Sequence, residues 1–233
     1  MKFGIICAMP EELKELLEQI ENVTEKEIGG KKYYSGTIAG QNVVLVESGI
    51  GKVEAGITTE HLITDFDVDV VINSGSAGGI GEHQHVGDIV ISTETAYHDA
   101  DARAFDYAYG QLPGQPARFT ASQKWGDALA NAGEKTGLNI EKGLIVSGDQ
   151  FVASKEAVKR IKQFFPDALS AEMEGAAVGQ VAYDHDVPYV VVRAMSDTAD
   201  DDAGVSFDEF IIQAGHRSAK MLLELFDELK KAE

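Results

Sequence analysis

Three short apolar runs, separated from one another by turns and helical patterns, constrain the fold of this chain more than any other feature. They cover residues 2–7, 42–47 and 68–75 and consist mainly of Val, Ile and other apolar residues. Continuous apolar runs of this length are typical of strands buried on both faces. Because helical patterns separate them, we predict an α/β fold with a largely parallel sheet, in which ligands bind beyond the carboxyl ends of the strands.

The first helix is predicted to begin at Pro10, where the missing N–H of proline costs no hydrogen bond. Its buried stripe consists of apolar residues at helical spacing, namely Leu13, Leu16, Leu17 and Ile20. At about 100° per residue, Glu11 lies opposite this stripe and Glu12 lies at its edge. We therefore expect Glu11 to be solvated and Glu12 to be the acid that can line a pocket.

The rest of the chain alternates the same kinds of element. We expect a hairpin at 29–41, an aromatic loop at 94–119, strands at 87–92, 143–147 and 187–195, and helices at 52–66, 121–136, 154–165, 173–183 and 207–231. Ser154 is the expected N-cap of its helix. The last helix is expected to turn its apolar residues inward, namely Ile211, Ile212, Leu222, Leu225 and Leu229. Since no linker or repeat divides the chain, residues 1–233 are expected to form one domain.

The charge and the cysteine count exclude several classes of function. The chain has a formal net charge of −19, whereas nucleic-acid and anionic-membrane surfaces need clustered Lys and Arg. The first apolar run is too short for a signal peptide or a membrane span. A single cysteine, Cys7, allows no intrachain disulfide. We expect a cytoplasmic protein with Cys7 buried in its core.

Three acids lie in or beside apolar segments near the end of the chain. Glu172 and Glu174 begin a predicted helix of small residues, and Asp197 follows the strand at 187–195. One interpretation is structural, because acids in a first helical turn interact favourably with the helix dipole and acids after strands often form turns. The other is functional: a rigid Glu174 offers two acceptor oxygens to the hydroxyls of a ribose, and Asp197 reaches the crevice at the strand ends.

Three other patterns carry less information. GSAGGIG at 75–81 lacks the spacing and the Lys-Ser or Lys-Thr ending of a P-loop, so close packing explains it as well as ligand contact does. HQH at 83–85 has no third ligand at a recognisable spacing, so we predict no metal site. The sequence from Gly75 to Gly78 departs from the nucleophile-elbow pattern, and no Ser–His–Asp triad is predicted.

Seven motifs stand in order along nearly the whole chain: CAMPEE at 7–12, ESGIGK at 47–52, NSGSAGG at 73–79, YHDAD at 97–101, SGDQFV at 147–152, EMEGAA at 172–177 and RAMSD at 193–197. Together they resemble the 5′-methylthioadenosine/S-adenosylhomocysteine nucleosidases of the nucleoside phosphorylase-like superfamily. The resemblance implies a three-layer α/β/α sandwich with a central mixed, largely parallel twisted sheet. It also implies a homodimeric hydrolase without a cofactor, which splits adenine from a thioribose.

The resemblance assigns roles to individual residues. Asp197 would protonate adenine at N7, with Ser196 holding its side chain, and Glu12 would take a proton from the attacking water. Glu174 and the backbone of Met173 would hold the ribose hydroxyls. The other substrate-binding residues that it implies are Met9, Ile50, Ser76, Gly78, Phe151, Val152, Arg193 and Phe207, with Phe105 and Pro113 of the partner subunit. N-ribosyl cleavage passes through a cation-like sugar, so an acid and a base are the minimum set, and Asp197 must carry a proton when it acts.

Three alternatives to this hydrolase stay open. A nucleoside phosphorylase would use phosphate in place of water, but a phosphate dianion beside Glu12 would meet like charge, and no arginine stands between Ala8 and Gly51. A nucleosidase for a futalosine-type adenine nucleoside would carry out the same reaction on another substrate. A nucleoside-sensing module would bind adenosine without releasing adenine.

Overall fold

Strand β1 (Lys2–Cys7) lies inside the sheet, between and parallel to β4 (Gln41–Glu47) and β5 (Val70–Gly79). The computed structural model describes residues 1–199 and 203–232. Side chains of β1 alternate between two hydrophobic cores on opposite faces of the sheet. Burial on both faces explains the continuous apolar run, and the three strands predicted from such runs are confirmed.

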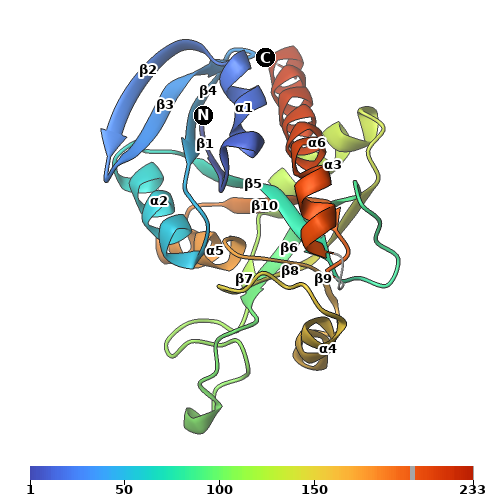
Figure 1. The fold of residues 1–233 in the computed structure, drawn as a ribbon. Coiled ribbons are helices and arrows are strands. Elements are labelled where there is room, and N and C mark those ends of the chain that lie inside the picture. The colour runs from blue at the N-terminus through green and yellow to red at the C-terminus, as the bar shows by residue number, and fades with distance from the viewer. Residues whose placement is uncertain (200–202, 233) are drawn as a thin grey trace.

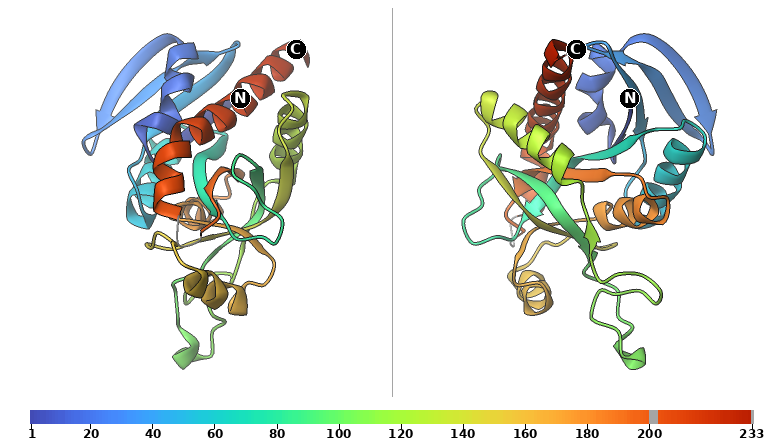
Figure 2. Two further views of the ribbon diagram at one scale, coloured as in Figure 1. Left: turned by 45° about the vertical axis from the view of Figure 1, so that its right-hand side comes forward. Right: turned by 180° about the vertical axis from the view of Figure 1, so that it is seen from behind.

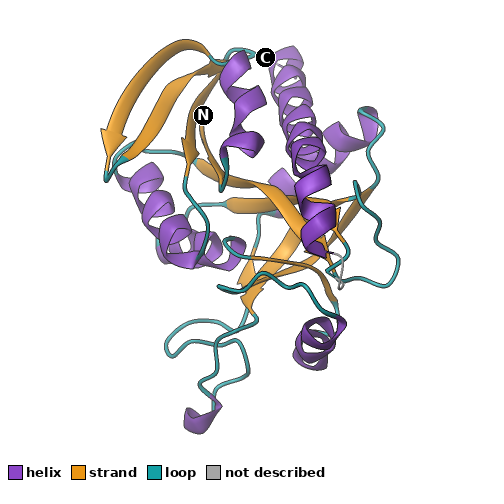
Figure 3. Ribbon diagram, in the orientation of Figure 1, coloured by secondary structure: helices purple, strands orange, loops and turns teal. Residues whose placement is uncertain are grey.

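The ten strands of the described residues belong to one sheet (Figures 1 and 3). The strands not yet placed are β2 (Glu21–Ile28), β3 (Lys31–Ile38), β6 (Ile89–Tyr97), β7 (Phe119–Thr120), β8 (Ile140–Ser147), β9 (Ala168–Glu172) and β10 (Tyr189–Asp197). The strand order is β10-β6-β8-β9-β5-β1-β4-β3-β2, with β7 on β6. Because β10 also pairs with β5, the first five strands of this order close into a ring.

The α/β class and the mixed sheet are confirmed, but two features differ from the expected sandwich with a largely parallel sheet. The first is the closed ring. The second is the strand direction, since the described residues form five parallel and five antiparallel pairings. Antiparallel pairs arise in the hairpins that join β2, β3 and β4, where β6 meets β10 and β7, and where β9 meets β5.

Helices cover the sheet in two groups (Figure 2). On one face α1 (Pro10–Gln19), α3 (Gln123–Lys135) and α6 (Ala203–Ala232) share a core, and on the other α2 (Lys52–Thr64) packs against α5 (Gly175–Asp184). The short helix α4 (Lys155–Phe164) lies apart from both groups, beside the ring (Figure 1). All six helices predicted from the sequence are present, with ends that differ by a few residues.

The exposure and hydrogen bonds of individual side chains test the predicted helix faces and caps. Glu11 is exposed and Glu12 is 3% exposed, as the helical periodicity predicted. The hydroxyl of Ser154 accepts a hydrogen bond from the N–H of Ala157, which confirms the predicted N-cap. The inward orientation expected for Ile212 is wrong, since its side chain is 69% exposed. Its neighbour Ile211 is buried, and successive residues of a helix point in directions about 100° apart.

Four segments form strands that were not predicted, and one of them is the two-residue strand β7 on β6. Strand β2 is exposed along nearly its whole length and is held at the sheet edge by pairing with β3. The glycine-rich residues 75–79 continue β5 instead of forming a loop. Strand β9 places Glu172 at a strand end, so the expectation that Glu172 begins a helix is also wrong.

The segment after β6 leaves the body of the molecule and returns at β7 (Figure 1). It contains one short 3₁₀ helix, η1 (Arg103–Phe105), whose last residue, Phe105, is 76% exposed. Pro113 on the same excursion is also exposed. None of the described helices combines the length and the apolar character needed to cross a membrane.

Candidate active site

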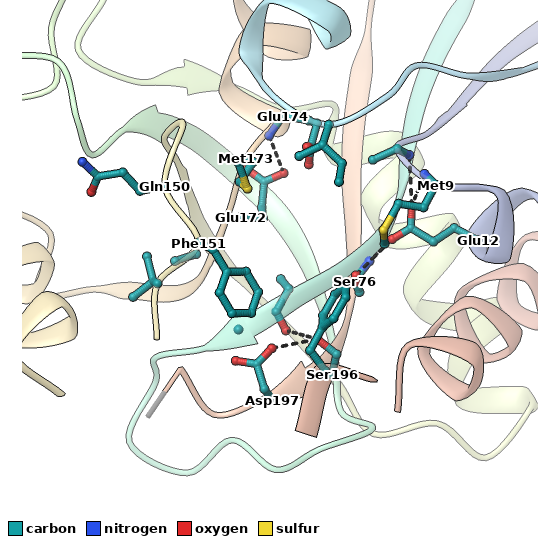
Figure 4. Close-up of a pocket in the computed structure, with 17 residues that line it drawn as sticks. Met9, Glu12, Ser76, Gln150, Phe151, Glu172, Met173, Glu174, Ser196 and Asp197 are labelled. Atoms are coloured by element: carbon teal, nitrogen blue, oxygen red, sulfur yellow. Dashed lines mark hydrogen bonds between the residues drawn. The ribbon is translucent and has the colours of Figure 1, made fainter. Parts of the chain in front are cut away.

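A cavity of about 560 Å³, counted with its mouth, opens where β1, β5, β9 and β10 reach their carboxyl ends (Figure 4). This is the crevice in which α/β sheets bind ligands. It brings together all the site residues predicted from the sequence except Arg193, Phe105 and Pro113. Those that line it are Met9, Glu12, Ile50, Ser76, Gly78, Phe151, Val152, Met173, Glu174, Ser196, Asp197 and Phe207.

Glu12 is held in the first turn of α1 by four hydrogen bonds. Its Oε2 accepts from the N–H groups of Ala8 and Met9 at 3.0 and 3.1 Å. Its Oε1 accepts from the N–H and the hydroxyl of Ser76 at 2.9 and 3.0 Å. Burial raises the pKa of Glu12 above its ordinary value, against the opposing effects of Arg193 and the Ser76 hydrogen bonds. The result is a fixed carboxylate that binds a proton more strongly than a solvated glutamate does.

Arg193, on β10, lies behind the cavity and is 1% exposed. Its Nε donates to Glu172 Oε2 at 3.1 Å, its Nη2 contacts the same oxygen, and Nη2 also donates to Asn73 Oδ1 at 2.6 Å. Burial alone would lower the pKa of Arg193, but Glu172 and the other glutamates around it outweigh burial and raise it. The guanidinium is therefore a permanent positive charge beside the cavity.

Gly75 allows this cation and the buried base to approach one another. A Cβ at this position would lie 2.7 Å from Arg193 Nη1 and 2.8 Å from Glu12 Oε1. Gly78 has a similar role on the other side, where a Cβ would lie 2.9 Å from Asp197 Oδ1. Part of the glycine-rich pattern at 75–81 is thus explained by close approach of site side chains.

Glu174 precedes α5 and faces both the cavity and the cation. Its Oε1 accepts from the N–H of Gly51 at 2.9 Å, and its Oε2 lies 3.4 Å from Arg193 Nη2. The side chain of Glu174 is 5% exposed, and burial together with the nearby Glu172 raises its pKa. Helix α5 begins at Gly175, so Glu174 occupies the N-cap position, but its side chain makes no capping hydrogen bond.

Asp197 is the last residue of β10 and is 1% exposed. Its Oδ1 accepts from the N–H of Ala199 and its Oδ2 accepts from the hydroxyl of Ser196, both at 2.8 Å. Figure 4 shows Asp197 and Glu12 on different sides of the cavity, with Ser76 between them. The acid at the strand end therefore reaches the crevice, and the two acids share one cavity.

Aromatic and aliphatic side chains form the remaining wall. The rings of Phe151 and Phe207 meet edge to face, with centroids 5.6 Å apart. Phe151 is half exposed at the mouth, beside the labelled Met173 and Asp197 (Figure 4). A half-exposed ring at a cavity mouth can stack on a planar base, which is the role expected for Phe151.

A charged cluster of Lys52, Asp99 and Asp149 joins two loops that line the cavity. Lys52 Nζ contacts both Asp99 oxygens, at 2.8 and 2.7 Å, and Asp99 Oδ2 accepts from the N–H of Asp149 at 2.9 Å. Asp149 Oδ1 in turn accepts from the N–H of Lys52 at 2.9 Å. The cluster fixes the loop that carries Phe151 against the start of α2. None of these three residues was predicted to belong to the site, although the motifs ESGIGK, YHDAD and SGDQFV contain one each.

The structure also locates the predicted residues that do not line this cavity. Arg193 lies directly behind it, whereas Phe105 and Pro113 are on the projecting excursion after β6 (Figure 1). No group of three or more potential metal ligands from His, Cys, Asp or Glu occurs within 1–199 and 203–232.

Known proteins share both the fold and the sequence. The family model described as the phosphorylase superfamily matches residues 2–227. The 5′-methylthioadenosine/S-adenosylhomocysteine nucleosidase of Actinobacillus succinogenes is 47% identical over 230 residues, which are 99% of this chain and 100% of that protein. The crystal structure of this nucleosidase from Neisseria meningitidis with methylthio-immucillin-A has a TM-score of 0.95 at 46% identity, covering 97% of this chain and 99% of that one.

A second solved structure agrees with the first. The nucleosidase from S. pneumoniae with a transition-state inhibitor has a TM-score of 0.94 at 47% identity, covering 98% of this chain and all of that one. The ring-containing sheet, the strand-end cavity and the family match define a protein of the phosphorylase superfamily. Within that superfamily, the chain belongs to the 5′-methylthioadenosine/S-adenosylhomocysteine nucleosidases, which confirms the resemblance of the seven motifs.

Proposed function

We propose that this chain hydrolyses the N-glycosidic bond of 5′-methylthioadenosine and S-adenosylhomocysteine, releasing adenine and the 5-substituted ribose. The observation that carries the proposal is the presence of two buried acids, Glu12 and Asp197, on different sides of one cavity at the strand ends. Membership of the nucleosidase family supports the same reaction. Its products belong to methionine salvage and to recycling of the methyl cycle.

Asp197 is the proposed general acid. Adenine is a poor leaving group as an anion, and a proton delivered to N7 lets it leave as a neutral base. The hydroxyl of Ser196, 2.8 Å from Asp197 Oδ2, holds the carboxyl group in place. The reaction requires Asp197 to be protonated when the substrate binds, and this protonation stays a prediction.

Glu12 is the proposed general base. Its fixed position and its raised pKa, caused mainly by burial, suit a group that takes a proton from water near neutral pH. Ser76 and Arg193 lie next to it and would orient that water. As C–N cleavage proceeds, the sugar becomes cation-like, and the activated water attacks the face opposite the leaving adenine.

The remaining cavity residues would contact three parts of the substrate: the ribose, the purine and the 5′ substituent. Glu174 and the backbone of Met173 would bind the ribose hydroxyls. Phe151 would stack on adenine, with the backbone of Val152 and of Gly78 close to the purine. Met9, Ile50 and Phe207 form the apolar surface that the alkylthio group would contact. Activity on 5′-deoxyadenosine would require no other arrangement, because that nucleoside lacks only the thioether.

The enzyme is proposed to act as a homodimer in which the excursion after β6 completes the neighbouring site. Phe105 of the partner subunit and Pro113 of the partner subunit would close the alkylthio end of the cavity. An apolar surface next to the same excursion supports this assembly, because Val53 and Ile57 on α2 and Tyr183 on α5 are each about half exposed or more. Sedimentation of the chain as a monomer at assay concentrations would contradict the dimer.

Three further parts of the proposal concern the whole chain. Residues 1–233 would form one nucleoside phosphorylase-like domain, and the single sheet supports this. Around β1 and β4 the fold would be a three-layer α/β/α sandwich, because helices lie on both faces of the sheet there. A cytoplasmic location stays a prediction.

The decisive experiment measures adenine release from both thioether nucleosides in phosphate-free buffer. We expect full turnover without phosphate, whereas a requirement for phosphate would make the chain a phosphorylase. Asp197→Asn and Glu12→Gln are each expected to lose most activity, and Glu11→Gln is the matched control because Glu11 is exposed. Circular dichroism and melting curves separate a chemical defect from unfolding. Tight adenosine binding without adenine, unaffected by Asp197→Asn, would instead indicate a nucleoside sensor.

A further inference from the structure

Glu172 is a buried carboxylate beside the cavity to which the proposed reaction gives no role. It accepts hydrogen bonds from the hydroxyl of Ser147, from the N–H of Glu174 at 3.1 Å and from the N–H of Gly175 at 2.8 Å. It also accepts from Nε of Arg193 at 3.1 Å and from Nη2 of the same guanidinium. Each of these neighbours donates a hydrogen to it, which is the environment that an anion needs.

Three buried glutamates share the single positive charge of Arg193, but they share it unequally. Glu172 binds two nitrogens of the guanidinium, whereas Glu174 has one longer contact, at 3.4 Å. The four hydrogen bonds of Glu12 come from other groups, although its carboxylate and Arg193 Nη1 both approach Gly75 closely. Glu172 is therefore the direct counterion of Arg193.

We propose that Glu172 is a positioning residue, which binds Arg193 through two nitrogens, neutralises its charge and thereby keeps Glu12 basic enough to take a proton from water. The inference rests on the proposed function, in which Glu12 is the base. Without Glu172, the charge of Arg193 would act on Glu12 and Glu174 alone. A positive charge at this range stabilises an ionised carboxylate, so Glu12 would become a weaker base.

The other groups around Glu12 do not supply a substitute for this counterion. The titratable groups that act on Glu12 or on the glutamates beside it are Cys7 on β1, His98 after β6, Glu174 before α5 and Arg193 on β10. Glu47 on β4 is exposed and acts on Cys7. From α6, the backbone of Gly215 approaches Glu12. Burial raises the pKa of Cys7 and lowers the pKa of His98, so both stay neutral near pH 7. Arg193 is thus the positive charge that most strongly opposes the effect of burial on the pKa of Glu12.

Glu172→Gln tests the proposal because glutamine keeps the size of the side chain and removes its charge. The protonation midpoint of Glu12 is read by NMR of protein labelled with ¹³C at glutamate carboxyls, with the Glu12 signal identified by its loss in Glu12→Gln. In Glu172→Gln we expect this midpoint to fall by about one to three pH units. The acid limb of the kcat/KM profile should move in the same direction, and the plateau should fall because the base is weaker.

The control and the second variant separate charge from structure. Ser147→Ala removes one hydrogen bond to Glu172 without changing its charge, so the Glu12 midpoint should stay in place. Asn73→Asp adds a negative charge next to Arg193 Nη2, so the midpoint should rise. A folded Glu172→Gln protein with an unchanged Glu12 midpoint overturns the proposal. If Glu172→Gln does not fold, an unchanged midpoint in Asn73→Asp overturns it in the same way.

Failure of this proposal can be told apart from failure of the proposed function. The function fails if the parent protein releases no adenine from either nucleoside. The NMR midpoints need no turnover, so they test the relation between Glu172 and Glu12 in either case. A lower kcat in Glu172→Gln with an unshifted pH profile would show that Glu172 serves only to support the fold.

Discussion

Gly75→Ala is the substitution whose effect follows most directly from the geometry of the site. The new Cβ would lie 2.7 Å from Arg193 Nη1 and 2.8 Å from Glu12 Oε1, whereas ordinary contacts begin near 3.4 Å. Restoring 3.4 Å from 2.8 Å requires Glu12 to move by about 0.6 Å. Both side chains are buried and hydrogen-bonded, so neither can swing into solvent.

The consequence for activity can be estimated from this displacement. Glu12 accepts from Ser76 at 2.9 and 3.0 Å, and a shift of this size away from Gly75 would stretch those bonds towards the limit of hydrogen bonding. A misplacement of about 1 Å in a catalytic group costs on the order of 10²-fold in rate. We expect Gly75→Ala to lower kcat/KM by about 10- to 100-fold. Overpacking should also destabilise the fold by about 1–3 kcal/mol.

Gly126→Ala is the matched control, because the same methyl group there meets atoms at ordinary distances of 3.7 and 3.9 Å. Gly126 lies within α3, where alanine is favoured over glycine by roughly 0.5–1 kcal/mol. Adenine release and urea unfolding are measured for both variants and for the parent. Parent-like kcat/KM in Gly75→Ala would refute the claim that close approach of Glu12 and Arg193 requires glycine.

Three further predictions concern other parts of the site. Asp197→Asn is expected to lower kcat/KM by about 10²- to 10⁴-fold, with the melting temperature showing that the protein still folds. Burial raises the pKa of Glu174 in the folded protein above its pKa in the unfolded chain. The contribution of Glu174 to the free energy of unfolding is therefore fully present below the unfolded-state pKa, and it is lost as the pH rises through the folded-state pKa. Glu174→Gln should therefore gain stability relative to the parent between pH 5 and 8 in urea titrations. Asp99→Asn should raise KM more than it lowers kcat, because Lys52 loses the partner that fixes the loop of Phe151.

Each of these predictions has an outcome that contradicts it. Full activity of Asp197→Asn would remove it as the proton donor. If the free energies of unfolding of the parent and of Glu174→Gln depend on pH in the same way, the pKa of Glu174 is not raised by folding. For Asp99→Asn, an unchanged KM with a large fall in kcat would place the cluster in the chemical step and not in substrate binding.

The elements of the site that follow from periodicity could be predicted from the sequence. The helical wheel distinguished buried Glu12 from exposed Glu11, although the two are adjacent. The apolar run at 187–195 correctly placed Asp197 at the end of a strand. Both predictions use only local spacing, which a single sequence records well.

The parts that could not be predicted depend on pairing between distant segments. The ring closes because β10 pairs with β5 as well as with β6, and no local pattern encodes that choice. Strand β9 is five residues long and is followed almost at once by α5, so its period is too short to recognise. The sequence pattern therefore predicted that Glu172 and Glu174 begin one helix. In the structure Glu172 ends a strand and binds Arg193, whereas Glu174 faces the cavity.

The excess negative charge of the site affects both the stability of the fold and the proposed reaction. Glu12, Glu172 and Glu174 are buried around one arginine, and burial raises the pKa of Glu12 and of Glu174. This excess of negative charge disfavours the folded protein at neutral pH. The same excess favours a positive charge in the cavity, and the cation-like sugar of N-ribosyl cleavage is the species that acquires one. Neutral substitutions at Glu12 and Glu174 should then stabilise the fold at high pH while slowing the reaction, because one electrostatic field is responsible for both effects.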